Sequence, residues 1–129
     1  MTIPSDRVYT KSHEWILDNG DGTATVGITH YAQDQLGDVV YFEPPDVGEL
    51  FEAGDQVATV ESVKAVSDIY TPVSGEIVAF NEELEDNPEV VNSDPYGQGW
   101  MFKVQLSDAD ELELLLDEGD YQTLLDEIE

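Results

Sequence analysis

Hydrophobic and polar residues alternate along most of the chain in short runs, each bounded by glycine, proline, asparagine or aspartate. Alternation with a period of two is typical of strands with one buried face, and such boundaries mark turns. The dense turn signal at 18–22 lacks the spacing and final glutamate of a calcium loop, so we interpret it as a hairpin turn. The pattern predicts strands over 7–10, 14–17, 23–29, 38–43, 56–62, 66–71 and 100–106.

Helical signals are confined to short segments between the strands. Thr29 is a suitable N-cap for a helix over 30–36, and Gly37 can end that helix. A single helical turn is expected over 88–91, whereas the acidic stretch 81–87 is expected to be a loop.

Two further short helices are expected after the last strand. Ser107 can cap a helix over 108–116, with acids in its first turn where the helix dipole favours them. We expect Gly119 to break this helix and a second one to follow over 121–128. The apolar residues of the first helix are expected to pack on the sheets: Leu112, Leu115 and Leu116.

The sequence Gly-Asp-Val-Val-Tyr-Phe at 37–42 recurs in similar form as Gly-Glu-Ile-Val-Ala-Phe at 75–80. A repeat of this kind predicts two similar half-sheets. Between the two copies, the runs 56–62 and 66–71 flank a tight connection that carries Lys64. On spacing alone Lys64 is a solvated charge that discourages aggregation, which is the common role of a lysine at a hairpin tip.

The chain has 129 residues, enough for one domain with a modest core, and it has no cysteine. Disulfides, thiolate metal sites and cysteine nucleophiles are therefore excluded, and any thiol chemistry must come from an attached cofactor. No apolar run reaches membrane-spanning length, and residues 1–6 lack a basic and apolar targeting signal. A cytoplasmic protein that needs no processing is expected.

Thirty acids against four bases give a formal charge of −26. Nucleic acids and anionic membranes are disfavoured as partners, because both require a basic surface. The acids are spread along the chain, and 107–129 contains ten acids and no base. This pattern predicts a halophilic protein, in which salt acts mainly on local clusters because the Debye length is already about 8 Å at physiological ionic strength.

No arrangement of side chains indicates catalysis by the chain itself. The sequence His-Glu-Trp at 13–15 lacks the second histidine of a zinc-protease motif, since Leu17 stands four residues after the first. With two histidines in all, a protein-built catalytic metal site is not expected. No phosphate-binding loop or nucleophile elbow is present. We therefore expect neither an enzyme nor a metal site.

The stretch around Lys64 resembles the modification hairpin of the biotinyl/lipoyl carrier domains. Biotin carriers typically have methionine on both sides of the lysine, whereas Lys64 lies between Val63 and Ala65, so the lipoyl branch fits better. The sequence Glu-Ser-Val-Lys-Ala is most similar to the H proteins of the glycine cleavage system. The resemblance rests on Gly-Asp at 54–55, Glu-Ser-Val-Lys-Ala at 61–65, Ser-Asp-Ile at 67–69 and Pro-Val-Ser-Gly-Glu at 72–76.

The similarity to this family extends over nearly the whole chain, including Ser-His-Glu-Trp at 12–15, Asn-Ser-Asp-Pro-Tyr at 92–96 and the leucine-rich C-terminal segment. Simple lipoyl domains of 2-oxoacid dehydrogenases lack the first and last of these segments. The resemblance implies a mainly β fold, a flattened β-barrel or sandwich of the biotinyl/lipoyl type (a barrel-sandwich hybrid) with short helices, two of them C-terminal. It implies a single lipoyl-carrier domain over 1–129, with a core at about 7–106 and a helical segment at 107–129.

The resemblance implies a carrier protein rather than an enzyme, with lipoate joined to Lys64 as an amide. In the family, glycine decarboxylase, a pyridoxal-phosphate enzyme, loads an aminomethyl group on the lipoyl-lysine arm. Aminomethyltransferase then removes this group, and the flavoprotein dihydrolipoyl dehydrogenase reoxidises the dithiol. A lipoate ligase or a lipoyl/octanoyl transferase attaches the cofactor, and the carrier is expected to be a monomer.

The resemblance also implies a cleft that shelters the loaded arm from water. Glu14 and Asp68 would pair with the cationic amine, and ordinary solvated charge is the alternative for both. The apolar members would line a groove, and plain core packing is the alternative for them. The implied cleft residues are Ser12, Glu14, Ile28, Ala32, Leu36, Ala65 and Asp68.

Two alternatives to glycine cleavage stay open. The first is a lipoyl carrier on another pathway, such as a relay that hands lipoate to other proteins. The second is an acidic interaction domain with no cofactor, which the mass of the intact protein distinguishes from both carriers.

Overall fold

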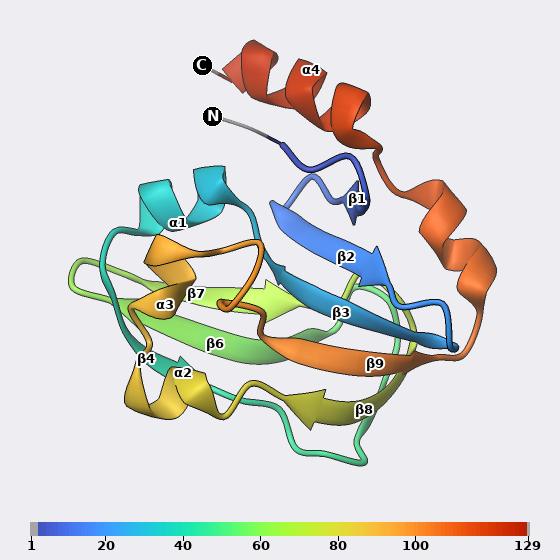
Figure 1. Ribbon diagram of the computed structural model, residues 1–129, viewed down its shortest axis with the longest axis horizontal. Coiled ribbons are helices and arrows are strands. Elements are labelled where there is room, and N and C mark those ends of the chain that lie inside the picture. Colours follow the sequence, from blue (N-terminus) through green and yellow to red (C-terminus); the bar gives the residue numbers. More distant parts are fainter. Residues whose placement is uncertain (1–2, 129) are drawn as a thin grey trace.

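The computed structural model describes residues 3–128, so the first two residues of the predicted N-terminus and the last residue of the segment 107–129 lie outside the described part. Two antiparallel sheets face each other as an unclosed, flattened sandwich (Figure 1). Short helices connect the strands, and a 3₁₀ helix and an α-helix follow the last strand. The mainly β fold class predicted from the sequence is confirmed.

The larger sheet has six strands and the smaller sheet has three. The larger one runs in the order β1 (Val8–Tyr9), β2 (Glu14–Asp18), β3 (Thr23–Ile28), β9 (Phe102–Leu106), β8 (Gly75–Phe80) and β5 (Leu50–Phe51). The smaller one runs in the order β4 (Val39–Glu43), β6 (Gln56–Ser62) and β7 (Val66–Tyr70). The predicted hairpin at 14–29 is confirmed, with Glu14 opposite Ile28.

The helices are α1 (His30–Leu36), α2 (Glu83–Asp86), α3 (Val90–Ser93), the 3₁₀ helix η1 (Ala109–Leu114) and α4 (Glu118–Ile128). The prediction for α1 is confirmed. The Thr29 hydroxyl accepts the Ala32 N–H at 3.3 Å, and the Gly37 N–H donates to the Gln33 carbonyl at the other end.

Three local predictions are wrong. The stretch 81–87 was expected to be a loop but contains α2. The expected α-helix over 108–116 is the 3₁₀ helix η1, and Asp108 rather than Ser107 caps it, accepting the Asp110 N–H at 3.0 Å. Gly119 does not break a helix but lies in the first turn of α4, because buried Tyr121 and Leu125 anchor that helix against the sheets.

Two hydrophobic cores support this arrangement. The main core fills the space between the sheets and includes fully buried Ile16, Phe42 and Phe102. The second core lies beneath α4. The predicted packing of the apolar residues of 108–116 is confirmed, since Leu112 of η1 and Leu115 just after it pack on the main core and Leu116 on the second. The second core consists of Tyr9, Trp15, Tyr121 and Leu125.

The internal repeat corresponds to strands β4 and β8. The pairing of β4 with β6 shifts register between Val39 and Tyr41, and the pairing of β8 with β9 shifts between Ile77 and Ala79. These are equivalent positions of the two repeat copies. The two repeat copies therefore share a strand and its irregularity, although the sheets that contain them have three and six strands.

Candidate functional site

Residues 63–65 join β6 to β7 in a tip whose shape is set by hydrogen bonds. The Ser62 hydroxyl accepts the Ala65 N–H at 3.0 Å and the Lys64 N–H at 3.3 Å. The Ser62 N–H donates to the Ala65 carbonyl at 2.8 Å, and the Val63 N–H donates to the Asp38 carbonyl at 3.0 Å. The tip is therefore closed on itself and tied to the link between α1 and β4.

Lys64 lies at this tip and is exposed. Within residues 3–128 it makes no ion pair. A Cβ at Gly37 would lie 3.1 Å from the Lys64 Cε, so the glycine leaves room for the lysine stem beside the end of α1. Val63 and Val66 are 69% and 65% exposed, which gives the lysine apolar neighbours in water.

The other two lysines have different surroundings. Lys11 is exposed on the turn between β1 and β2, so exposure alone does not distinguish it from Lys64. Lys103 is half-buried on β9, with its Nζ 5.1 Å from the Trp100 ring centroid. Only Lys64 occupies a hairpin tip with exposed valines on both sides.

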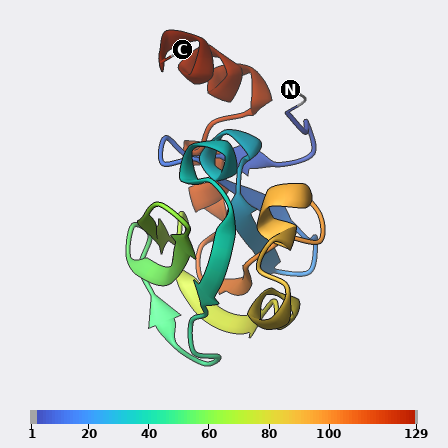
Figure 2. The ribbon, with the colours of Figure 1, turned by 90° about the vertical axis from the view of Figure 1, so that its left-hand side faces the viewer.

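A hollow of about 320 Å³, the hairpin hollow, opens directly beside the tip. Figure 2 shows the three segments that surround it, namely α1, the β1–β2 turn and the β6–β7 hairpin. It is lined by Ser12, His13, Tyr31, Ala32, Gln35, Leu36, Ala65, Val66 and Ser67.

A second hollow of about 530 Å³, the Glu14 hollow, lies at the other end of β7. Ser12 lines both hollows, so together they follow β7 from its first residue to its last. The Glu14 hollow is lined by Thr10, Ser12, Glu14, Ala53, Gly54, Tyr70, Thr71 and Pro72.

Glu14 is an unusual acid on this protein because it is only 3% exposed. Its carboxylate accepts the Thr10 hydroxyl at 2.7 Å. Burial raises the pKa of Glu14 above its ordinary value, and hydrogen bonds from the Thr10 hydroxyl and the Tyr70 N–H oppose that rise. A cationic group that entered the hollow would favour the ionised carboxylate and relieve the cost of burying it.

The structure brings most of the expected cleft residues to these hollows. Ser12, Glu14, Ala32, Leu36 and Ala65 all line one or both of them.

The remaining two expected residues lie elsewhere. Ile28 is 3% exposed in the main core. Asp68 is exposed, lines neither hollow, and accepts the Gln56 side-chain N–H at 2.9 Å.

Sequence reasoning missed several lining residues, above all His13 and Tyr31. Their rings lie 4.6 Å apart between centroids and form an aromatic wall of the hairpin hollow. His13 has a backbone φ of +70°, which residues other than glycine seldom adopt. The sequence does not single out this position, because left-handed backbone is uncommon at any given histidine even though histidine adopts it more often than most residues.

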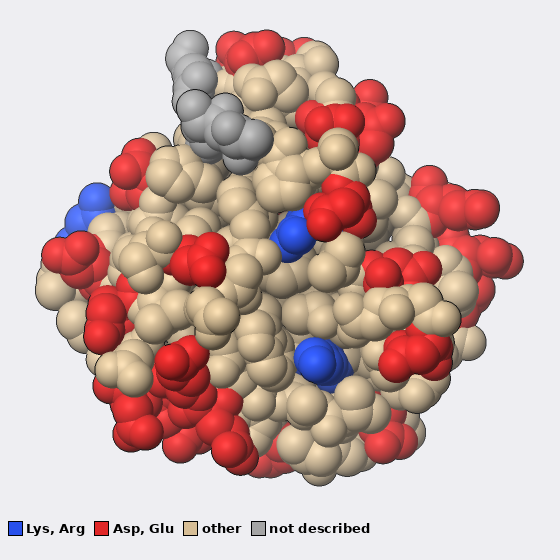
Figure 3. All heavy atoms as spheres, in the orientation of Figure 1, with Lys and Arg blue, Asp and Glu red and all other residues tan. Residues whose placement is uncertain are grey.

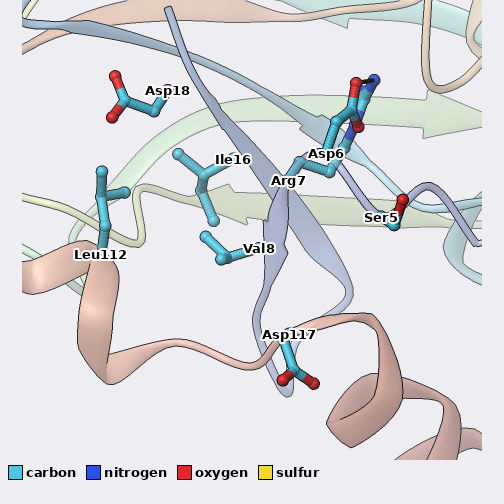
Figure 4. Close-up of a pocket in the computed structure, with 8 residues that line it drawn as sticks. All are labelled: Ser5, Asp6, Arg7, Val8, Ile16, Asp18, Leu112 and Asp117. Atoms are coloured by element: carbon cyan, nitrogen blue, oxygen red, sulfur yellow. Dashed lines mark hydrogen bonds and ion pairs between the residues drawn. The ribbon is translucent and has the colours of Figure 1, made fainter. Parts of the chain in front are cut away.

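A third hollow, of about 370 Å³, shares no residue with these two. Figure 4 shows Val8, Ile16 and Leu112 between the carboxylates of Asp18 and Asp117. The Arg7–Asp6 ion pair also belongs to its lining. It contains no lysine, and we assign no chemistry to it.

Comparisons with known proteins agree with this geometry. The family model described as "Glycine cleavage H-protein" matches residues 7–128. The chain belongs to the glycine cleavage H-protein family. The glycine cleavage system H proteins of Aeromonas salmonicida and Thermus thermophilus are 61% and 60% identical over 125 and 126 residues, covering 97% and 98% of both chains.

A solved structure agrees as well. The glycine cleavage system H protein from Mycobacterium marinum superposes with a TM-score of 0.87 at 41% sequence identity, covering 96% of this chain and 99% of that one. Membership in the glycine cleavage H-protein family supports a lipoyl-carrier role in the glycine cleavage system.

In this H-protein family member, the segment 92–96 supports the site from behind. The Asn92 side chain donates to the Gly37 carbonyl at 2.8 Å and accepts the Val39 N–H at 2.8 Å, which fixes the end of α1 beside the hairpin. The Tyr96 hydroxyl accepts the His30 N–H at 3.1 Å at the other end of the helix. Both ends of α1 are therefore held in place.

The surface of this family member is acidic. Figure 3 shows carboxylates spread across one face with few basic side chains among them. Among residues 3–128 there is no group of three or more histidines and carboxylates placed to hold a metal ion. No helix in the same range is long and apolar enough to cross a membrane.

Proposed function

We propose that the chain carries lipoate as an amide on Lys64 and moves an aminomethyl group from glycine decarboxylase to aminomethyltransferase. The supporting observation is that an exposed lysine at a closed hairpin tip directly precedes Ala65, Val66 and Ser67, which line a hollow. Lipoate supplies a disulfide and dithiol chemistry that a chain without cysteine lacks. The role is that of a carrier and not of an enzyme.

The residues present fit such a cofactor. The Ser62 hydrogen bonds hold the tip in one shape for the enzyme that attaches lipoate. Amide formation removes the Lys64 charge, which suits a side chain flanked by Val63 and Ala65. The hairpin hollow begins at Ala65, so an attached apolar arm has somewhere to lie out of water.

Glu14 and Asp68 have separate parts in the proposal. Glu14 is the acid that would bind a cationic amine inside the Glu14 hollow, because it is buried and has no basic partner within residues 3–128. Asp68 would attract the amine from the outer face of β7. The alanine variants of Glu14 and Asp68 should keep lipoylation and lose the aminomethyl group to water faster. Retention as long as in the parent would show that neither acid holds the amine.

The proposal includes the remaining partners of the system. These are dihydrolipoyl dehydrogenase and a lipoate ligase or lipoyl/octanoyl transferase. The chain would act as one lipoyl-carrier domain, in the cytoplasm and as a monomer, because a net charge of −26 opposes self-association. We also propose that the acidic composition is an adaptation to a medium of high salt concentration.

Coexpression with a lipoate ligase, followed by peptide mass mapping, tests the attachment. One lipoyl group is expected on Lys64, and Lys64→Arg should abolish it while the fold survives. The matched controls Lys11→Arg and Lys103→Arg should be loaded like the parent. An unmodified Lys64, or equal labelling of Lys11, would overturn the proposal. Loading without acceptance of the aminomethyl group would favour a relay that hands lipoate to other proteins.

A further inference from the structure

The Tyr121 side chain connects the C-terminal helix to segments that line the hairpin hollow. Tyr121 of α4 is fully buried, and its ring stacks on Tyr9 with centroids 4.8 Å apart. Its hydroxyl lies 2.8 Å from His13 Nδ1 and 2.7 Å from Thr29 Oγ1. One hydroxyl therefore joins α4 to two segments that are distant from it in sequence.

These two contacts belong to different walls of the hollow. His13 lines it from the β1–β2 turn, in the left-handed backbone conformation described above. Thr29 caps α1 by accepting the Ala32 N–H, and Ala32 lines the hollow from that helix. Tyr121 is not among the lining residues, so it acts on the hollow only through its two partners.

One arrangement of the protons satisfies all of these contacts, and the tautomer of His13 measured below tests it. In this arrangement the Thr29 hydroxyl accepts the Ala32 N–H and donates its own proton to the Tyr121 oxygen. The Tyr121 hydroxyl then donates to Nδ1 of His13, which requires a neutral ring with its proton on Nε2. Burial lowers the pKa of His13, which favours this neutral form.

We propose that Tyr121 is a positioning residue of the hairpin hollow, whose hydroxyl holds the His13 turn and the N-terminus of α1 at a fixed separation. The inference deepens the proposed function and rests on it, since it concerns the hollow beside Lys64. The C-terminal helix then has a definite task, which is to set the shape of a cleft that it does not line.

The chain provides a matched control in the same aromatic stack. Tyr9 is also fully buried. Its hydroxyl donates to the Pro4 carbonyl and forms a hydrogen bond with neither His13 nor Thr29. Tyr121→Phe and Tyr9→Phe each remove one buried hydroxyl and keep the ring. Both variants are expected to fold. Failure of Tyr121→Phe to fold beside a folded Tyr9→Phe would overturn the proposal, because a positioning hydroxyl leaves the fold intact.

Nitrogen NMR of the histidine rings in unlipoylated protein gives the first readout. His13 should carry its proton on Nε2 in the parent and in Tyr9→Phe, and should become a mixture of tautomers in Tyr121→Phe. His30 should be unchanged in all three proteins and is the internal control, since its Nδ1 faces Gln33. An unchanged His13 spectrum in Tyr121→Phe would overturn the proposal.

Hydrogen exchange gives the second readout on the same samples. The Ala32 amide should exchange about three- to tenfold faster in Tyr121→Phe, the factor expected from one weakened buried hydrogen bond, and at the parental rate in Tyr9→Phe. Equal rates in the two variants would contradict the assignment.

The loaded protein gives the third readout. Tyr121→Phe should lose the aminomethyl group about three- to tenfold faster than Tyr9→Phe, with equal lipoylation of Lys64. Equal loss from the two variants would overturn the positioning role. A parent protein that cannot be loaded would overturn the proposed function alone, and the two measurements on unlipoylated protein would still decide the role of Tyr121.

Discussion

The two sheets contain the same strand unit and use it differently. Strands β4 and β8 have similar sequences and the same pattern of burial. Val39 and Ile77 are buried at equivalent positions, and the residues that follow them, Val40 and Val78, are exposed. However, β8 lies between β9 and β5 in the larger sheet, whereas β4 is an edge of the smaller sheet.

The difference lies in what surrounds the repeated unit. The other edge of the smaller sheet is β7, and both hollows follow this uncovered edge. In the larger sheet, added strands and the C-terminal segment occupy the corresponding space. The repeated strand unit therefore supplies a scaffold in both sheets, and the site forms along β7, at the edge of the smaller sheet that no further strand covers.

Replacing the last residue of each repeat copy, Phe42 or Phe80, with alanine should give the largest difference in stability between the two sheets. Phe42 is fully buried and Phe80 is half-buried, so Phe42→Ala should lower the free energy of unfolding by about 3–5 kcal/mol and Phe80→Ala by about half as much. Urea unfolding measures both. Equal losses would show that the difference in burial between Phe42 and Phe80 does not set their contributions to stability.

Salt should act on the two regions unequally. The segment 107–129 contains ten acids and no base, and its described residues 107–128 pack on the larger sheet. Raising potassium chloride from dilute buffer to molar levels, with chelator present, should raise the thermal midpoint by on the order of 10 °C. Hydrogen exchange should show 107–128 loosening first at low salt. A flat midpoint would refute the halophilic interpretation.

The hairpin and α1 were predictable because their signals are local. Turn residues bound the strands around Lys64, and Thr29 and Gly37 occupy the two caps of α1. The start of α4 was not predictable, because buried Tyr121 stabilises a helical turn that contains Gly119.

The candidate site was predictable only in part. Lys64 stands out by its motif, and Ser12, Glu14, Ala32, Leu36 and Ala65 meet at the hollows. The contributions of His13 and Tyr121 come from their contact with each other, and these two residues are 108 positions apart in the sequence. No local pattern encodes such a contact.

Loss of one serine hydroxyl in each half should have similar energetic and different functional effects. Ser62→Ala removes the hydrogen bonds that shape the lysine tip, and Ser74→Ala removes bonds to Ala53 and Glu111 beside the larger sheet. Each should lower the free energy of unfolding by about 1 kcal/mol. Only Ser62→Ala should slow lipoate attachment by a lipoate ligase. Equal attachment rates would show that the tip needs no fixed shape.

The smallest effect concerns Glu14, which joins the larger sheet to the uncovered β7 edge. Its folded-state pKa is raised above the ordinary 4.5, so its contribution is most favourable below that value and is lost as pH rises through the folded-state pKa. Glu14→Gln should therefore be more stable than the parent at pH 7, and the difference should shrink as pH falls towards about 4. A constant difference across this range, measured by urea unfolding, would contradict a buried, unpaired carboxylate.

Isotope transfer from glycine shows whether the β6–β7 hairpin carries the aminomethyl group of glycine cleavage. Lipoylated protein is incubated with glycine decarboxylase, pyridoxal phosphate and glycine labelled with ¹³C at its α-carbon, and is then digested for mass mapping. One labelled aminomethyl group per chain is expected, on the peptide that contains lipoyl-Lys64. The Lys64→Arg variant should carry none. Absence of the label from the parent, or label on peptides that contain Lys11 or Lys103, would contradict this role of the hairpin.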